Sequence, residues 1–301
     1  MLGVYKDFAE QELAMPVIEG RKSESEKFAG AVHTYSIEAL MGDARALQAG
    51  TSHHLGQNFA KVFDITFQAR DKSVQHVWQT SWGMSTRLVG GVIMMHGDDS
   101  GLILPPRIAP YQVVIVPILR GNWQETILPY AESVRDELNA AGVRVTLDAR
   151  DSYTPGWKFA EWELKGVPVR LEVGPKDIEK SQVLSVRRDN RNKVAFARKE
   201  VISEVQTLLS EIQQDLFERA CRFREEYTVR TTSYEEFKKI MEGRPGFVIS
   251  PWCGETTCEA AIKAETQATI RNLPMSGLEA SANCVRCEAP AREQAYFAKS
   301  Y

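Results

Sequence analysis

The chain has 301 residues and a mass of 33.9 kDa, which is enough for two or three domains with separate cores. Its 43% hydrophobic and 26% charged residues are typical of globular proteins and exclude a collagen-like, low-complexity or mainly disordered chain. The net charge is −3, yet residues 150–199 carry 12 Lys and Arg against 7 Asp and Glu. This basic stretch either attracts a polyanion or forms a solvated basic face.

The sequence contains no recognisable membrane or export signal. The first residues, MLGVYKDFAEQE, place acids and an aromatic where a signal peptide needs an apolar core. The densest apolar stretch, residues 113–119, is too short to span a bilayer. Because five cysteines occur without an export signal, we expect a reducing compartment and no disulfide framework. These features predict a cytoplasmic protein with no membrane partner.

The first section ends at the Pro-rich segment LPPRIAP, residues 104–110. Within it, QAGTSHHLGQNF (48–59) predicts a strand followed by a helix. WQTSWGMSTRLVGGVIMMHGDD (78–99) predicts a strand, Gly83, and a helix beginning near Ser85 or Thr86. Arg87 would then lie in the first turn, where a cation opposes the helix dipole. A nucleotide phosphate or a purine ring would explain it, and a nearby carboxylate is the alternative.

Three other features of this section have structural interpretations. VGG at 89–91 lies inside an apolar run, which favours close helix packing over a phosphate loop. Residues 98–99, both Asp, are predicted in a solvated turn. The His53–His54 pair has no further ligand cluster nearby in the sequence, so no metal site is predicted there.

The middle section alternates strands and helices. VVIVPIL (113–119) predicts a buried strand, and residues 123–142 predict a helix ending at Gly142. A short helix is expected around 159–166, and further strands are expected at 143–149, 167–174, 182–188 and 193–199. This alternation predicts a small α/β domain with a mostly parallel sheet.

A long amphipathic helix is predicted from about Glu200 to Tyr227. Its apolar stripe, with residues three or four apart, consists of Val201, Val205, Leu208, Ile212, Leu216, Ala220, Phe223 and Tyr227. Such a stripe is typical of a helix that packs on a core or joins domains. Cys221 lies on or beside this stripe and is predicted to be a buried structural thiol.

Four of the five cysteines have metal-site spacing. Cys253, Cys258, Cys284 and Cys287 form C-x4-C-x25-C-x2-C, two close pairs that can bring four thiolates to one tetrahedral point. The spacing predicts a structural Zn²⁺ site, with an iron centre or a redox dithiol as alternatives. Four protein ligands leave no open position for a substrate.

Several segments together resemble class II prolyl-tRNA synthetases of the archaeal/eukaryotic-like type. The stretch TSWGMSTRLVGGVIMMHGDDSGLILPPRIAP resembles motif 3 and the exit from the catalytic domain, and ALQAGTSHHLGQNFAKVFDI resembles a strand and loop of the same active site. DSYTPGWKFAEWELKGVPVRLEVGPKD resembles the anticodon-binding domain. The family's C-terminal zinc domain is resembled by WCGETTCEAAIKAETQATIRNLP, CVRCEAPA and YFAKSY.

The resemblance implies a multi-domain α/β chain. Residues 1–107 would be the C-terminal part of a class II catalytic domain with an antiparallel sheet and helices. Residues 108–212 would be an α/β anticodon-binding domain, and 213–301 a small α+β zinc-binding domain. Motif 1, motif 2 and the Thr/Glu loop of the family are not recognised between Met1 and Gln48. The chain is therefore expected to be part of a longer enzyme, with apolar surface exposed on an incomplete catalytic sheet.

The resemblance also implies site residues, carried over by position. The ATP site would comprise Gln48, Thr51, Thr86 and Arg87, with Ser85 beside them, and the proline pocket His53, Ser81, Trp82 and Gly83; Arg87 and His53 would be catalytic. The anticodon would meet Phe159, Glu163, Arg170 and Lys176, and the carboxylate of Tyr301 would reach toward the active site. The zinc ligands would be the four clustered cysteines.

The implied reaction is the ATP-dependent activation of L-proline to prolyl-adenylate and its transfer to tRNA(Pro). Mg²⁺ would accompany ATP, zinc would be structural, and the full-length enzyme is expected to be a homodimer. Because motifs 1 and 2 are not found, this chain alone is expected to be inactive. The alternative is a non-catalytic tRNA(Pro)-binding module built from the same domains.

Overall fold

The computed structural model describes residues 1–243, 245–275 and 282–301. The described residues form two compact units. Unit 1 comprises Met1–Gln11, Met15–Met95 and Cys221–Tyr301, and unit 2 comprises Glu12–Ala14 and His96–Ala220. Among the described residues, no helix is long and apolar enough to cross a membrane.

Unit 1 is built on an eight-stranded sheet. Its strand order is β12 (Thr228–Arg230), β13 (Phe247–Trp252), β15 (Glu293–Ala298), β14 (Thr269–Pro274), β1 (Val17–Arg21), β2 (His33–Leu40), β3 (Ala46–Gly56) and β6 (Gln79–Gly83). Only the β12–β13 pair is parallel. Because β1 pairs with β14, the first and third sections of the sequence share one sheet. The predicted division at residues 107 and 212 stays a prediction.

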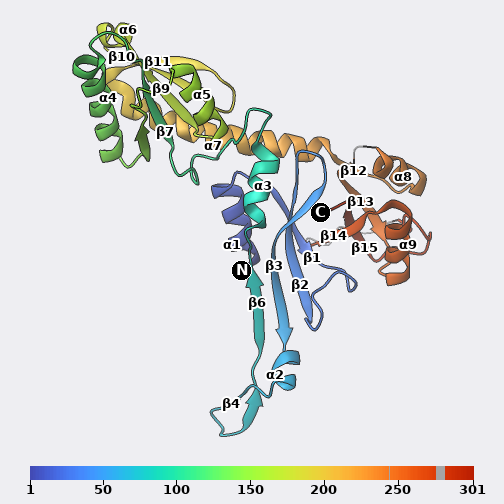
Figure 1. The fold of residues 1–301 in the computed structure, drawn as a ribbon. Coiled ribbons are helices and arrows are strands. Elements are labelled where there is room, and N and C mark those ends of the chain that lie inside the picture. Colours follow the sequence, from blue (N-terminus) through green and yellow to red (C-terminus); the bar gives the residue numbers. More distant parts are fainter. Residues whose placement is uncertain (244, 276–281) are drawn as a thin grey trace. The chain divides into compact units, whose positions relative to one another are not determined.

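Short helices and a hairpin complete unit 1. The helices are α1 (Leu2–Asp7), α2 (Asn58–Val62), α3 (Arg87–His96), α8 (Tyr234–Glu242) and α9 (Thr256–Thr266), and a π-helical turn at Phe8–Glu12 follows α1. A two-stranded hairpin is formed by β4 (Thr66–Gln68) and β5 (Val74–His76). Figure 1 shows α8 and α9 beside the C-terminal strands. The predicted strand-to-helix transition at 48–59 is confirmed. The helix predicted to begin near Ser85 or Thr86 begins at Arg87, which lies in its first turn as expected.

Glycine packing in α3 agrees with the sequence interpretation at one position. A Cβ at Gly91 would lie 3.0 Å from side-chain atoms of both Leu47 and Met15, so a side chain at this position would require the ends of those two side chains to move. A Cβ at Gly90 would meet only Met94, at 3.9 Å. Of these two glycines, Gly91 is therefore the one in close contact with its surroundings.

The edge of the sheet exposes apolar side chains, as the sequence predicts. Side chains on β6, the hairpin and the adjacent segments are exposed, with Trp78 at 71% and Trp82 at 53%. The other large exposed members of this group are Val62, Phe63, Ile65, Phe67 and Val74. Such a concentration exceeds the scattered exposure that is normal for a protein surface.

Unit 2 contains a five-stranded sheet. The order is β11 (Lys193–Ala197), β10 (Gln182–Arg187), β9 (Val169–Val173), β7 (Val113–Pro117) and β8 (Val145–Leu147). The three strands β9, β7 and β8 are parallel, whereas β10 and β11 are antiparallel to their neighbours. The prediction of a mostly parallel sheet is thus wrong for the last two strands. The segments before them are too short for the crossover that a parallel strand needs.

Helices cover both faces of this sheet. On one face, α4 (Trp123–Ala140) and α7 (Val201–Glu226) pack on alternate residues of β7 and β9. On the other, Phe159 and Trp162 of α5 (Pro155–Leu164) pack on Val114 and Val116. The short helix α6 (Pro175–Glu179) follows β9, and a 3-10 turn at Arg198–Glu200 precedes α7. The predicted buried strand at 113–119 and the helix at 123–142 are confirmed.

The long predicted helix is confirmed as α7. Its stripe from Val201 to Ala220 is buried, whereas Phe223 and Tyr227 are partly buried against the core of unit 1. Cys221 is half-buried rather than buried. The helix runs through the division between the units at Ala220, which agrees with a helix that joins domains.

The turn at Asp98 has a partner that the sequence interpretation missed. Both carboxylate oxygens of Asp98 accept hydrogen bonds from Arg188, at 2.6 and 2.9 Å. The Arg188 side chain is only 3% exposed, so the carboxylate neutralises a buried guanidinium. Asp98 thus lies in an exposed turn, as predicted, and its carboxylate also has a structural role in unit 2.

Candidate functional site

Strand register in unit 1 brings several predicted site residues onto one face. His53 on β3 lies opposite Ser81 on β6, and Thr51 lies opposite Gly83. Directly opposed residues of antiparallel strands share a face, and residues two apart on one strand do as well. Thr51, His53, Ser81 and Gly83 therefore line one face at the β3–β6 end of the sheet.

A bulge in β3 adds Gln48 to this face. The β2–β3 register shifts between Ile37 and Glu38, so that Gln48 lies opposite Glu38 while Thr51 lies opposite Ser36. In a regular strand, residues three apart point to opposite faces. The extra residue of the bulge restores a common face for Gln48 and Thr51.

Trp82 is not brought together with these residues. It lies opposite Ser52, between Ser81 and Gly83, so strand alternation directs it to the other face. Its side chain is 53% exposed. The structure therefore separates Trp82 from the other predicted proline-pocket residues.

Arg87 lies close to the bulged strand. It is the first residue of α3, its backbone N–H donates to Ser85 Oγ at 3.3 Å, and its Nη1 is 3.5 Å from the Gln48 carbonyl oxygen. Thr86 directly precedes it and is exposed. No carboxylate among the described residues forms an ion pair with Arg87. The guanidinium is thus available for an anion next to Gln48 and Thr51.

Tyr301 lies near the beginning of β3. Its backbone N–H donates to the Ala46 carbonyl at 3.4 Å, and the Arg45 guanidinium is 5.8 Å from its ring centroid. Burial and a hydrogen bond with Asp43 raise the pKa of the Tyr301 hydroxyl to about 12. The chain end therefore lies two residues along the strand from Gln48.

A buried polar network connects this sheet region with β14. Glu38 is fully buried and accepts hydrogen bonds from Lys22 Nζ at 2.7 Å and from Arg271 at 2.8 and 3.0 Å. Asn272 Oδ1 accepts from Ser36 Oγ at 2.8 Å. Sequence reasoning missed this network because Arg271 and Asn272 lie more than 230 residues along the chain from the β2 residues that they contact.

Three of the four predicted anticodon residues converge in unit 2. The Arg170 guanidinium lies 4.0 Å from the Phe159 ring centroid, and its Nη1 donates to Glu163 at 2.9 Å. Glu172 accepts two further hydrogen bonds from Arg170, at 3.0 and 3.1 Å. Lys176 is exposed in the first turn of α6, past the other end of β9. Glu172 was missed, although it follows Arg170 by two residues on one strand and thus shares its face.

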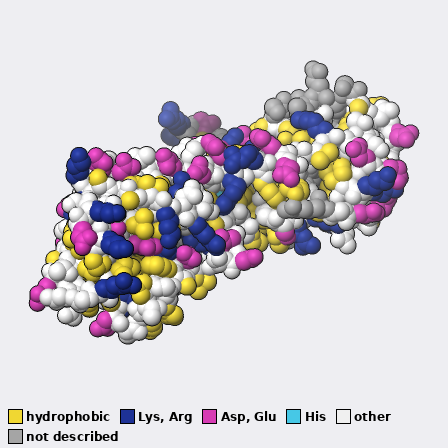
Figure 2. Space-filling model, turned by 90° about the horizontal axis from the view of Figure 1, so that it is seen from above, with side chains coloured by type: hydrophobic (Ala, Val, Ile, Leu, Met, Phe, Trp, Pro, Cys, Tyr) yellow, Lys and Arg dark blue, Asp and Glu magenta, His cyan; other side chains and the backbone are white. Residues whose placement is uncertain are grey.

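The basic stretch at 150–199 is only partly a surface feature. Four of its cations, Lys158, Arg170, Arg187 and Arg188, are buried and paired with carboxylates. Figure 2 nevertheless shows Lys and Arg side chains gathered beside hydrophobic ones on one face of unit 2. Part of the charge surplus is therefore neutralised inside unit 2, and only the exposed remainder could form a solvated basic face or attract a polyanion.

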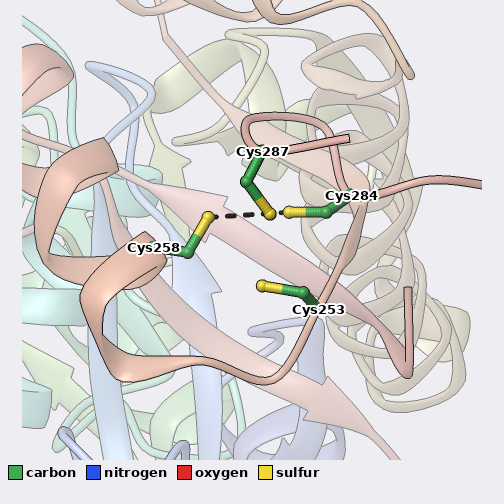
Figure 3. A group of neighbouring side chains, drawn as sticks. All are labelled: Cys253, Cys258, Cys284 and Cys287. Carbon is green, nitrogen blue, oxygen red and sulfur yellow. Dashed lines mark hydrogen bonds between the residues drawn. The ribbon is translucent and has the colours of Figure 1, made fainter. Parts of the chain in front are cut away.

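The four clustered cysteines converge in unit 1 (Figure 3). Their sulfur atoms all lie within 4.8 Å of one another, and those of Cys258 and Cys284 are 3.6 Å apart. Cys253 follows β13, Cys258 lies in α9, and Cys284 and Cys287 belong to a turn before β15. A tetrahedral ion with Zn–S bonds of about 2.3 Å requires sulfurs about 3.8 Å apart. The arrangement therefore fits a metal ion with four thiolate ligands.

The pKa values of these thiols are shifted in different directions. Burial raises the pKa values of Cys253 and Cys258. At Cys284 burial acts in the same direction, but backbone N–H groups, those of Cys287 and Arg286 foremost, outweigh it and lower the pKa to about 7. One thiolate is thus already favoured near neutral pH, which suits a cation-binding site.

Comparisons with known proteins agree with this geometry. A family model described as "Anticodon binding domain" matches residues 112–208, and one described as "Prolyl-tRNA synthetase, C-terminal" matches residues 234–301. The chain is 50% identical over 303 residues to "Proline--tRNA ligase" of Natranaerobius thermophilus, covering 100% of this chain and 62% of the relative. It is 48% identical over 309 residues to that of Chlorobium chlorochromatii, covering 100% and 64%.

"Proline--tRNA ligase 2" of Clostridioides difficile is 50% identical over 302 residues, with 100% of this chain and 62% of the relative covered. The chain thus spans less than two thirds of the length of these relatives. The model of the C-terminal residues and the relatives, which match all of this chain, nevertheless point to one group of enzymes, the aminoacyl-tRNA ligases specific for proline. The chain therefore corresponds to the C-terminal part of prolyl-tRNA synthetases, with an anticodon-binding domain followed by the C-terminal domain of these enzymes.

Proposed function

We propose that the chain serves proline--tRNA ligase activity, the ATP-dependent activation of proline and its transfer to tRNA(Pro). The observation that carries this proposal is the common face of β3 and β6. There the bulge aligns Gln48 with Thr51, and Arg87 lies against Gln48. These are the positions at which the family resemblance implies ATP contacts.

In the proposed reaction the proline carboxylate attacks the α-phosphorus of ATP, and the bond to pyrophosphate breaks. A hydroxyl at the tRNA 3′ end then attacks the prolyl carbonyl and AMP leaves. Arg87 and a Mg²⁺ ion bound with ATP would offset the charge that develops on the phosphate, and the sheet face would hold the reactants in line. His53, Ser81 and Gly83 would surround proline. We also propose that the longer enzyme is a homodimer.

The anticodon would be recognised in unit 2. Arg170 can donate two hydrogen bonds to a guanine edge, Glu163 can accept one from a base, and Phe159 can stack on a base. Glu163 and Glu172 hold Arg170 in place before RNA arrives. Lys176 would meet a phosphate or a base at the exposed start of α6.

The metal of this proposal is Zn²⁺, held by Cys253, Cys258, Cys284 and Cys287. Thiolate ligands in a tetrahedral set favour zinc over hard cations such as Mg²⁺. When bound, the ion would stabilise the fold and take no part in the chemistry, because all four positions are filled by protein.

A second candidate function is tRNA(Pro) binding without catalysis. The converging residues lie inside unit 2; they are Phe159, Glu163 and Arg170. Anticodon recognition therefore does not depend on the common face of β3 and β6 where ATP would bind. Proline-dependent exchange between ATP and labelled pyrophosphate separates the two candidates. Exchange by this chain excludes the non-catalytic function, whereas tRNA binding without exchange supports it.

Anticodon recognition is tested by binding of the chain to tRNA(Pro) and to a copy altered in the last two anticodon bases. We expect tighter binding to the natural anticodon. We expect Arg170→Lys to remove most of this difference in affinity, because lysine cannot form the bidentate hydrogen bond to a guanine edge. Lys199→Gln changes an 83% exposed cation of the same unit and serves as the control. Equal binding of both tRNAs by the unaltered chain would refute the anticodon assignments.

A further inference from the structure

Thr34 and His53 form a side-chain hydrogen bond between neighbouring strands. Thr34 on β2 lies directly opposite His53 on β3, and its Oγ1 is 3.0 Å from His53 Nδ1. Thr34 is 2% exposed. The His53 ring also lies against Phe28, with ring centroids 4.9 Å apart. The ring orientation is therefore fixed from two sides.

The other partner of Thr34 determines the direction of this hydrogen bond. The backbone N–H of Phe28 donates to Thr34 Oγ1 at 3.0 Å, so one lone pair of the hydroxyl is occupied. A hydroxyl also has one hydrogen to donate. Among the described residues, its only acceptor is His53 Nδ1. Because a buried donor without a partner costs about 1 to 3 kcal/mol, Thr34 donates and Nδ1 accepts.

An accepting Nδ1 carries no proton, so the proton of the neutral imidazole lies on Nε2. Protonation of Nδ1 would leave the Thr34 hydroxyl hydrogen facing another hydrogen. Burial also disfavours the charged imidazolium and so lowers the pKa of His53. Since Nδ1 and Nε2 lie on different edges of the ring, Nε2–H remains for a ligand on the face shared with Thr51 and Ser81.

We propose that Thr34 is a positioning residue that holds His53 as the neutral Nε2–H tautomer, which makes His53 a hydrogen-bond donor to an oxygen of the amino-acid substrate. The acceptor would be the proline carboxylate or the carbonyl oxygen of prolyl-adenylate. The cationic imino group of proline is itself a donor, so it would lie away from His53. A neutral imidazole that donates to a carbonyl is a known catalytic arrangement. This inference rests on the proposed proline site.

The tautomer can be measured without catalysis. The chain has five histidines, so two-bond proton–nitrogen correlations of ¹⁵N-histidine-labelled protein give five ring patterns, and His53→Gln identifies the one from His53. We expect the Nε2–H pattern in the unaltered chain and in Thr34→Ser, which keeps the hydroxyl. Thr34→Val should give a mixture of tautomers and a higher His53 pKa. Thr228→Val removes a hydroxyl elsewhere in unit 1 and should leave the pattern unchanged.

An Nδ1–H pattern in the unaltered chain, or an unchanged pattern in Thr34→Val, would overturn the inference. A non-hydrolysable prolyl-adenylate analogue, prolyl-sulfamoyl adenosine, then tests the substrate contact. Binding with a shift of the His53 Nε2 resonance supports it, and binding without that shift overturns it. If the analogue does not bind, the proposed proline site fails in this chain, while the tautomer measurement still decides the role of Thr34.

Discussion

The ion pair between Asp98 and Arg188 makes one carboxylate important for the stability of unit 2. The hydrogen bonds from Arg188 lower the pKa of Asp98 to about 2, against the partial opposing effect of burial. A carboxylate with a lowered pKa in the folded state stabilises the fold above its unfolded pKa of 3.8. That contribution is lost as the pH falls through about 2.

We expect Asp98→Asn to destabilise unit 2 by about 1 to 2 kcal/mol at neutral pH, because the neutral amide leaves a buried guanidinium without its counter-ion. This range of free energy allows for solvent screening of the partly exposed carboxylate. Amide hydrogen exchange in β9 and β10, measured between pH 7 and pH 2.5, would show a lower stability of the variant and a weaker dependence of that stability on pH. The adjacent, exposed Asp99→Asn is the control, and equal effects of both would contradict the ion-pair role.

Gly20 allows β14 side chains to reach β2. Gly20 on β1 pairs with Pro274 on one side and Ser36 on the other. A Cβ at this position would lie 2.4 Å from the Leu273 carbonyl oxygen and 2.8 Å from Asn272 Cβ. Neither atom belongs to the flexible end of a side chain, so a larger residue would displace the strand that carries Asn272.

Gly20→Ala is therefore expected to destabilise unit 1 by about 2 to 4 kcal/mol, as overpacking in a core does. The measurement is a thermal melting curve combined with hydrogen exchange in β14. Gly83→Ala is the matched strand variant, since nothing lies within 4 Å of its added Cβ, and its stability should change by less than about 0.5 kcal/mol. A melting temperature of Gly20→Ala equal to that of Gly83→Ala would disprove the steric argument.

The proposed metal site would connect the segments at residues 253–255 and 284–287, the cysteine turns, with α9 and strands β13 to β15. We expect Cys284→Ser to abolish stoichiometric zinc binding and to lower the stability of unit 1 by several kcal/mol, because a structural Zn²⁺ contributes roughly 10 kcal/mol in small domains. Metal content and melting temperature check both effects. Cys221→Ser, a cysteine outside the cluster, should retain zinc. Full zinc content in Cys284→Ser would remove Cys284 from the ligand set.

Whole elements could be predicted where the signal is local in the sequence. The helical stripe of α7 and the apolar run of β7 each lie within one continuous segment, so their 3.6-residue period and their length were sufficient. The direction of β10 and β11 could not be read in this way. It depends on which neighbour a strand pairs with, and two short apolar runs look the same in parallel and antiparallel sheets.

For the molecule as a whole, the two units should respond differently to metal removal. Strands β13, β15 and β14 belong to the same sheet as β1 and β2, so loss of the metal should accelerate hydrogen exchange through β14 into β1. Exchange in β7 and β9 of unit 2 should not change. Exchange measured with and without a zinc chelator decides this, and acceleration confined to the cysteine turns would contradict coupling through the sheet.

The sequence by itself determined the features that depend on neighbours in the chain: a long helix from about Glu200 to Tyr227, Arg87 in the first turn of a helix, and the spacing of the four cysteines. The family resemblance added candidate site residues, whose roles stay predictions. Only the tertiary structure decided which distant side chains meet, as in the pairs Arg188–Asp98 and Glu38–Arg271. Those contacts depend on strand order and register, which no local pattern specifies, because pairing energy is shared among strands far apart in the sequence.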